Sequence, residues 1–178
     1  MLVFFVLLFE KYSLPLHRIK HYATLNMEKR NNPEIPQGQT KEDVKIRKKI
    51  IMDFYAQWNA SNPNKRIYNA DLKNFIYVRF LSMQETAEHA SLQYKSTKAI
   101  TYLTEILELA TLKTRTKPKA EVSNQKRFAE IVIMEYNKAG LGRLKLTVGV
   151  LRGSKQYIQY CITAIEKTTT QPARTRNS

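Results

Sequence analysis

The residues best suited to chemistry lie in a polar segment near the middle of the chain, residues 82–91 (SMQETAEHAS). This segment contains His89, and the cations Arg79 and Lys95 flank it on either side. A histidine side chain can accept or donate a proton near neutral pH, while arginine and lysine bind phosphate oxygens. These residues predict acid–base chemistry on a phosphate-containing substrate, with His89 as the group that transfers the proton. The alternative interpretation is that His89 is an ordinary surface or capping residue.

A large excess of positive charge gives a second indication of the partner. The 178 residues include 30 Lys and Arg but 15 Asp and Glu, so the formal net charge is +15. A positive potential attracts phosphates, which favours a nucleic acid, although an anionic membrane surface would be attracted in the same way. Six cations around Pro118 are predicted to bind the nucleic-acid backbone: Lys113, Arg115, Lys117, Lys119, Lys126 and Arg127. Tyr157 is predicted to add a stacking surface for bases.

Several classes of protein are excluded by what the chain lacks. It has 5 glycines and neither a GxGxxG nor a GxxxxGKS/T motif, which argues against dinucleotide-binding and P-loop folds. With one cysteine, Cys161, it cannot form an internal disulfide, and its 3 histidines offer no credible zinc site. We therefore expect no metal or cofactor, a cytoplasmic location, and a Cys161 that is packed rather than nucleophilic.

Composition divides the chain into four segments. Residues 1–26 begin with nine apolar residues (MLVFFVLLF), fewer than the roughly 20 needed to cross a bilayer. We interpret residues 1–26 as an over-extended start or an unstructured leader, with an export or membrane-anchoring segment as the alternative, and expect no stable membrane insertion. Residues 27–40 contain Pro33 and Pro36 and are predicted to be irregular. A single domain is expected over 41–167, followed by a disordered basic tail over 168–178.

The first element of the domain is predicted to be a helix over residues 41–58. Thr40 can cap this helix together with Asp43. Apolar residues recur at helical spacing along it: Ile46, Ile50, Ile51, Phe54, Tyr55 and Trp58. The cations expected on its solvent side are Lys45, Arg47, Lys48 and Lys49.

The pattern then changes several times before residue 125. Residues 75–80 (FIYVRF) are rich in β-branched and aromatic side chains and predict a strand, whereas residues 82–91 are predicted to be a polar loop. A second helix is predicted to begin at Ser96 or Thr97, with an apolar stripe of Ile100, Leu103, Ile106, Leu107 and Ala110. The acidic residues expected on its solvated side are Glu105 and Glu108. Residues 111–124 are predicted to be a linker.

The last third of the chain predicts three antiparallel strands. Residues 126–136 (KRFAEIVIMEY) fit either a helix or a strand, and the β-branched run IVI favours the first of these strands. Residues 144–152 and 156–165 alternate apolar and polar side chains on either side of a GSK turn, which predicts a hairpin. In the second strand of this hairpin, the side chains expected to face inward are Ile158, Tyr160, Ile162 and Ala164, and those expected to face outward are Tyr157, Gln159, Cys161 and Thr163. The sequence thus predicts an α+β fold, with helices packed on an antiparallel sheet that ends in a meander.

Three stretches occur in an order that is typical of one group of small domains: FIYVRFLS (75–82), AITYLTEILELA (99–110) and RLKLTVGVLRGSKQYIQYCITAIE (143–166). Over residues 66–166 the chain resembles domains associated with large polyvalent proteins of phages and mobile elements. Those domains are similar to nucleases of the Barnase–EndoU–colicin–RelE type. The resemblance includes no catalytic signature. It implies a helix packed on a four-stranded antiparallel sheet and, in some relatives, metal-independent RNA cleavage.

The resemblance also implies roles for the candidate residues. Metal-independent RNA cleavage needs a base for the 2′-hydroxyl proton and cations around the phosphate, for which His89, Arg79 and Lys95 are the candidates. Thr163 lies on the polar face of the last strand, where members of the superfamily place active-site groups. The chain is therefore predicted to be a small basic nucleic-acid-binding module of a phage or mobile element, with RNA preferred over DNA and ribonuclease activity left open. The alternative is a non-catalytic accessory domain that binds a protein partner.

Overall fold

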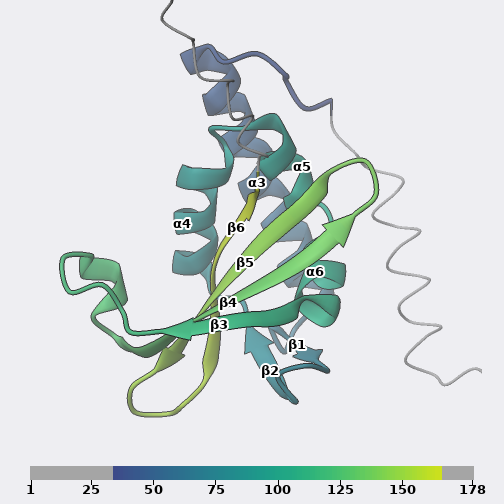
Figure 1. Ribbon diagram of the computed structural model, residues 1–178. Helices are drawn as coiled ribbons and strands as arrows, with labels where there is room; N and C mark the ends of the chain where they lie inside the picture. Colours follow the sequence, from purple (N-terminus) through teal and green to yellow (C-terminus); the bar gives the residue numbers. More distant parts are fainter. Residues whose placement is uncertain (1–33, 166–178) are drawn as a thin grey trace, which may run out of the picture. The chain divides into compact units, whose positions relative to one another are not determined.

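The computed structural model describes residues 34–165, which form an α+β fold (Figure 1). The α-helices of this part of the chain are α3 (Lys41–Ser61), α4 (Phe80–Ala90), α5 (Tyr94–Ile100) and α6 (Leu103–Leu109). The strands are β1 (Arg66–Asn69), β2 (Asn74–Tyr77), β3 (Thr111–Thr116), β4 (Phe128–Lys138), β5 (Gly142–Leu151) and β6 (Tyr157–Ala164), with a 3₁₀ turn η1 (Ser123–Gln125) before β4. From Ile35 onward the described residues belong to one compact unit. The predicted fold class is confirmed.

The strands form one curled sheet in the order β1-β2-β6-β5-β4-β3 (Figure 1). The predicted meander is confirmed, because β4, β5 and β6 pair in antiparallel fashion. β2 and β6 are parallel, with Ile76 opposite Tyr157 and Tyr77 opposite Ile158. The sheet is therefore mixed and six-stranded, unlike the four-stranded antiparallel sheet that the resemblance implied. Strand β1 was not predicted, since its four residues are too few to show a clear alternation.

The main core lies between one face of the sheet and the helices. The capping box of Thr40 and Asp43 begins α3 as predicted, and Ile51, Tyr55 and Trp58 of this helix are buried. The stripe predicted for the second helix is also buried: Ile100, Leu103, Ile106, Leu107 and Ala110. These side chains pack against inward-facing residues of the sheet, including Val132, Met134, Leu144, Leu146 and Val148. Apolar spacing was thus a sufficient guide to most of this core.

Residues 80–90 form helix α4, so the predicted polar loop over 82–91 is wrong. Apart from Met83, the buried positions of α4 hold small or hydroxyl-bearing residues: Ser82, Thr86, Ala87 and Ala90. Because large apolar residues are scarce there, the segment lacks the stripe from which an amphipathic helix is predicted. Phe80, expected to end a strand, instead begins this helix and is 54% exposed.

Two further predictions between residues 94 and 124 are wrong. The single helix expected from Ser96 or Thr97 is two short helices, α5 and α6. The linker expected over 111–124 begins with β3, an edge strand whose side chains are nearly all exposed and therefore show no alternation.

Asn69, which is fully buried, donates from Nδ2 to the carbonyls of Leu107 (2.8 Å) and Ala110 (2.9 Å). It thereby satisfies carbonyl groups at the end of α6 that have no partner within the helix.

Arg47 was predicted to face solvent but is fully buried. Its Nε donates to the carbonyl of Ser91 at 2.6 Å, and its Nη1 donates to the carbonyls of Pro36 (3.0 Å) and Gly38 (2.6 Å). These hydrogen bonds offset part of the cost of burying the charge, although Nη2 is buried without a hydrogen-bond partner among the described residues. Arg47 therefore connects the segment before α3 to the turn after α4.

Glu105, also predicted to face solvent, is 8% exposed. Its carboxylate accepts hydrogen bonds from Lys138 Nζ, at 2.6 and 2.8 Å to the two oxygens, and from the Tyr136 hydroxyl. Lys138 Nζ lies 4.1 Å from the centroid of the Tyr102 ring. These contacts attach α6 to the end of β4 and account for the burial of the carboxylate.

A β-bulge at Tyr160 breaks the alternation predicted for β6. Thr147 lies opposite Cys161 and Val148 opposite Gln159, so Tyr160 has no partner on β5. A bulge shifts the residues on one side of it to the other face of the sheet. Gln159 is consequently fully buried instead of exposed. Tyr160 joins a small cluster, separate from the main core, with Phe128, Ile131 and Ile158.

Candidate functional site

A cavity of about 360 Å³ lies between α4 and the segment that joins β3 to β4. Its walls come from the outward face of α4, from the η1 region and from the bulge of β6. The lining residues are Leu81, Gln84, Glu85, Glu88, Asn124, Arg127 and Tyr160. Figure 1 shows the β3–β4 segment projecting beyond the strands on the same side of the sheet as α4. We call this space the α4 cavity.

Glu85 is at the centre of the polar contacts in the α4 cavity. Its Oε1 accepts a hydrogen bond from the Tyr160 hydroxyl at 3.1 Å, and its Oε2 accepts one from Asn124 Nδ2 at 2.8 Å. His89 Nε2 lies 3.3 Å from Oε1, an i, i+4 contact along α4. The side chain of His89 is 55% exposed and that of Glu85 is 22% exposed. The carboxylate is therefore mostly covered, whereas the imidazole is open to solvent.

The bulge in β6 explains how Tyr160 reaches Glu85. β2 pairs with β6 only as far as Ile158, and α4 packs along the remaining edge. Thr86 Oγ1 donates to the Tyr160 carbonyl at 3.4 Å and accepts from Gln159 Nε2 at 2.7 Å. These contacts fix α4 against the bulge, so the Tyr160 hydroxyl lies within hydrogen-bonding distance of the carboxylate.

The protonation of the neighbouring side chains follows from this environment. Burial and, to a smaller extent, the Glu85 carboxylate raise the pKa of Tyr160 to about 12. The phenol therefore stays protonated at neutral pH and remains a donor to Glu85. Burial also raises the pKa of the Cys161 thiol to about 11, with a further contribution from Glu85. A protonated thiol is a poor nucleophile, so Cys161 is not activated for covalent chemistry.

Cations gather beside the α4 cavity at the start of β4. Arg127 lines the cavity, and its backbone carbonyl accepts a hydrogen bond from the backbone N–H of Arg152 at 3.2 Å. Arg152 Nε donates to the carbonyl of Lys126 at 3.0 Å. On the opposite wall, Glu88 forms an ion pair with Lys48. The arrangement combines a carboxylate–imidazole pair with nearby cations, a combination that can transfer a proton and hold an anionic group.

The four residues predicted for catalysis do not converge on one cleft. Arg79 precedes α4 and donates from Nη2 to Gln156 Oε1 at 3.0 Å, whereas His89 lies at the other end of the helix. At 1.5 Å per helical residue, these two residues are about 15 Å apart. Lys95 borders a different cavity, of about 830 Å³, beside the turn between β4 and β5. Thr163 lies near the end of β6, and of the four residues His89 is the one that contacts Glu85 in the α4 cavity.

The six cations predicted to bind nucleic acid are all exposed, and they follow one stretch from β3 to the start of β4. Among the residues that the structure describes, Arg115 is the one member of this set with an ion pair, to Glu130 at 2.6 Å. The Arg115 guanidinium also lies 6.0 Å from the centroid of the half-buried Tyr157 ring. Since β3 and β6 are not adjacent in the sheet, its curl brings these two predicted residues together.

Glu85, Asn124 and Tyr160 were not among the predicted site residues. The spacing of Glu85 and His89 is visible in the sequence, but it indicates a contact only when residues 80–90 are recognised as a helix. The direction of Tyr160 depends on the bulge, and the position of Asn124 depends on how the β3–β4 segment folds back. Neither of these features has a signal in a single sequence.

Comparisons with known proteins add no further constraint on the site. No protein-family model matches the chain, and no match was found among curated proteins or solved structures. Within residues 34–165, none of the helices is long and apolar enough to cross a membrane. The same residues contain no group of three His, Cys, Asp or Glu side chains that could hold a metal ion.

Proposed function

We propose that this protein is a small basic RNA-binding module of a phage or mobile element that acts in the cytoplasm. The observation that carries the proposal is the row of exposed cations from Lys113 to Arg127 beside the α4 cavity. Five of these six cations form no ion pair with another described residue, Arg115 being the exception. Their charge is therefore available to phosphates, and binding should release counterions from the nucleic acid.

The preference for RNA over DNA in this proposal comes from the acid–base pair next to the cations. RNA carries a 2′-hydroxyl that such a pair can deprotonate, and DNA does not. The resemblance to nuclease-like domains supports the same preference.

RNA cleavage is a second candidate function, favoured by the contact between Glu85 and His89. A proton on His89 Nε2 would donate to Glu85, leaving Nδ1 as a free base at the exposed edge of the ring. In this proposal Nδ1 takes the 2′-hydroxyl proton, the 2′-oxygen attacks the adjacent phosphorus, and the bond to the 5′-oxygen breaks. The departing 5′-oxygen takes a proton from a water molecule, and His89 returns its proton to the resulting hydroxide, which yields a 2′,3′-cyclic phosphate and a 5′-hydroxyl. Arg127 would balance the charge that develops on the phosphate.

Binding and cleavage can be tested together with labelled single-stranded RNA and DNA of the same sequence. Affinity is measured by fluorescence anisotropy over a series of salt concentrations, and products are separated on a gel after incubation in EDTA. We expect RNA binding that weakens with salt. Replacing Lys113, Lys117, Lys119 and Lys126 with glutamine should reduce the log–log salt slope by up to about 2.8, because each phosphate contact on a single strand contributes about 0.7.

A matched variant controls for the loss of net charge. It replaces four exposed lysines of the α3–α5 region with glutamine, Lys41, Lys45, Lys49 and Lys95, and should leave the slope nearly unchanged. A reduced slope in this variant, with an unchanged slope in the first variant, would indicate that α3 forms the RNA interface. Cyclic-phosphate products in EDTA would support cleavage, and intact but bound RNA would support binding alone. Absence of RNA binding under all salt conditions would refute the proposal and favour an accessory domain that binds protein.

A further inference from the structure

The β1–β2 hairpin carries exposed aromatic side chains that the α4 cavity does not use. Tyr68 lies opposite Phe75, and Arg66 lies opposite Tyr77, so these four side chains share one face of the hairpin. Tyr68 is 48% exposed and Phe75 is 37% exposed. Their ring centroids are 5.4 Å apart with the planes at 73°, an edge-to-face contact that keeps both rings ordered at the surface.

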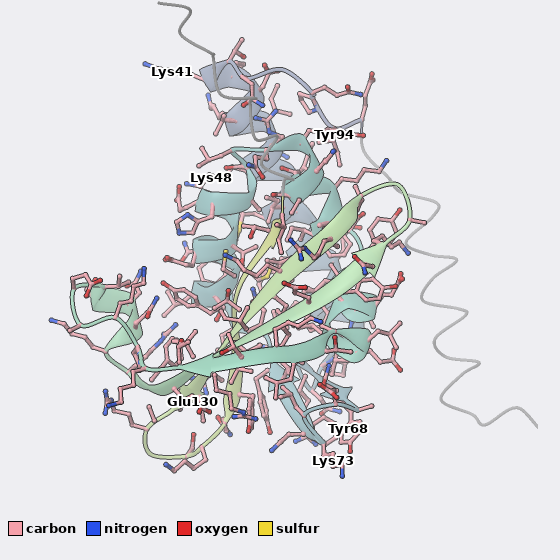
Figure 2. All side chains as sticks on the ribbon, in the orientation of Figure 1. Lys41, Lys48, Tyr68, Lys73, Tyr94 and Glu130 are labelled. Carbon is pink, nitrogen blue, oxygen red and sulfur yellow. The ribbon has the colours of Figure 1, made fainter. Side chains whose placement is uncertain are left out.

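Arg66 adds positive charge to this aromatic face. Its guanidinium lies 4.4 Å from the centroid of Phe75 and 5.8 Å from that of Tyr77, and its Nη1 donates to the Tyr77 hydroxyl at 3.1 Å. Lys65 and Lys73, both exposed, stand immediately before β1 and β2. Figure 2 labels Tyr68 and Lys73, which both lie at the lower end of the molecule in this view. Rings and cations therefore occur on the same small element.

The local charge favours an anionic partner. Residues 65–77 contain three cations and one acidic residue, Asp71, whose Oδ2 accepts a hydrogen bond from the backbone N–H of Leu112 at 2.6 Å. A second copy of this hairpin would bring like charges together, which opposes self-association through this face. A partner that combines flat apolar rings with negative charge matches both properties of the surface.

We propose that this hairpin face binds unpaired bases of single-stranded RNA. Bases would stack on Tyr68 and Phe75, while Arg66, Lys65 and Lys73 would contact the flanking phosphates. The bases of a duplex are already stacked on one another and cannot lie on protein rings without melting. The inference rests on the proposed RNA-binding function and defines its substrate class as single-stranded.

The test compares three fluorescent RNAs of equal length: a single strand, a blunt-ended duplex and a single strand with abasic sites. Wild-type protein should bind the single strand most tightly. The double substitution Tyr68→Leu and Phe75→Leu keeps apolar bulk but removes the aromatic faces. It should weaken binding of the single-stranded RNA roughly 5- to 150-fold for each stacked base. It should leave binding of the duplex RNA unchanged. Phe80→Leu, at an exposed aromatic residue outside the β1–β2 hairpin, is the matched control and should have no effect.

The abasic strand keeps the result decisive if the double variant does not fold, because it removes bases from the ligand instead of rings from the protein. Wild-type protein should bind the abasic strand no better than the duplex RNA. Wild-type binding of all three RNAs with equal affinity would overturn the inference while leaving the proposed function intact. Wild-type protein that binds none of them would refute the proposed function and this inference together. Loss of self-association in the double variant, with unchanged RNA binding, would assign the face to protein contacts and also overturn the inference.

Discussion

Glu105 and Glu85 each accept a hydrogen bond from a tyrosine hydroxyl on a neighbouring strand, but the surroundings of the two carboxylates differ. The side chain of Glu105 is 10% exposed, and both of its oxygens accept hydrogen bonds from Lys138 in addition to the bond from Tyr136. Glu85 is 22% exposed and contacts Tyr160, Asn124 and His89 instead. The first carboxylate has a permanent counter-ion in a closed site. The second has an amide, a phenol and an exposed imidazole as neighbours, beside a cavity.

This difference distinguishes a contact that fixes the fold from one that borders a cavity. The Glu105–Lys138 ion pair and the hydrogen bond from Tyr136 hold α6 against β4. His89 Nε2 lies 3.3 Å from Glu85 Oε1, and the His89 side chain is 55% exposed. Burial alone therefore does not identify a functional carboxylate. The identity of its partners and their access to solvent are more informative.

The largest expected effect tests the open site. In the proposed cleavage His89→Ala removes the base, so the rate should fall by about 10²–10⁴-fold while RNA affinity remains nearly intact. The free energy of unfolding should change by no more than about 0.5 kcal/mol, since the side chain is largely exposed. Leu92→Ala, at an exposed residue that does not line the cavity, is the control and should keep the rate. A large loss of stability without a selective loss of activity would make His89 structural.

Substitution of Glu105 should have the opposite effect, a loss of stability without a loss of RNA binding. Glu105→Gln removes the counter-ion of a mostly covered ammonium group, so we expect the free energy of unfolding to fall by about 2 kcal/mol with no change in RNA affinity. Glu85→Gln should lower it by less than about 1 kcal/mol, because its partners are uncharged or exposed. Urea denaturation of both variants measures the difference. Equal losses of stability would contradict the assigned difference in roles.

Alkaline pH provides a smaller effect at the open site. The pKa of Tyr160 is raised from 10.0 to about 12, so the folded state binds the phenolic proton more tightly than the unfolded state does. The stability that this difference contributes is fully present below about pH 10 and is lost as the pH rises through about 12. Wild-type protein should therefore lose stability between these values relative to Tyr160→Phe. Urea denaturation at several alkaline pH values and ultraviolet difference titration measure this, and a phenol that titrates near 10 would contradict it.

The smallest effect is expected at Cys161, which adjoins the bulge. The Glu85 charge helps to raise the pKa of this thiol, so Glu85→Gln should increase the thiolate fraction and accelerate alkylation by iodoacetamide roughly twofold. Glu105→Gln should leave the alkylation rate unchanged. Mass spectrometry of the modified protein gives both rates. An acceleration in both variants would indicate a general loosening of the fold in place of a local charge effect.

Local sequence patterns were a good guide wherever one face of an element is apolar and the other polar. The capping box at Thr40 and Asp43, the buried stripe from Ile100 to Ala110 and the strands β4, β5 and β6 were all predicted. In these elements, the side chains that interact are three or four residues apart on a helix, or alternate along a strand. The positive charge and its concentration around Pro118 were equally visible, because they do not depend on the fold.

The site residues were predicted less well because their contacts join distant segments. Glu85 meets Tyr160 only because α4 replaces β2 as the neighbour of β6 and because a bulge turns the strand. α4 itself was missed because small and hydroxyl-bearing residues fill its buried face.

The sequence by itself determined the α+β class, most of the core and the charge that favours nucleic acid, since all three follow from composition and short-range spacing. Only the tertiary structure decided which charged residues are enclosed and which remain accessible. Arg47 and Glu105 are buried against partners from remote segments: backbone carbonyls accept from Nε and Nη1 of Arg47, and a lysine and a tyrosine donate to Glu105. The exposed rings of Tyr68 and Phe75 were likewise revealed by the pairing of β1 with β2. The free energy of a charged or aromatic side chain depends on neighbours that no local pattern specifies.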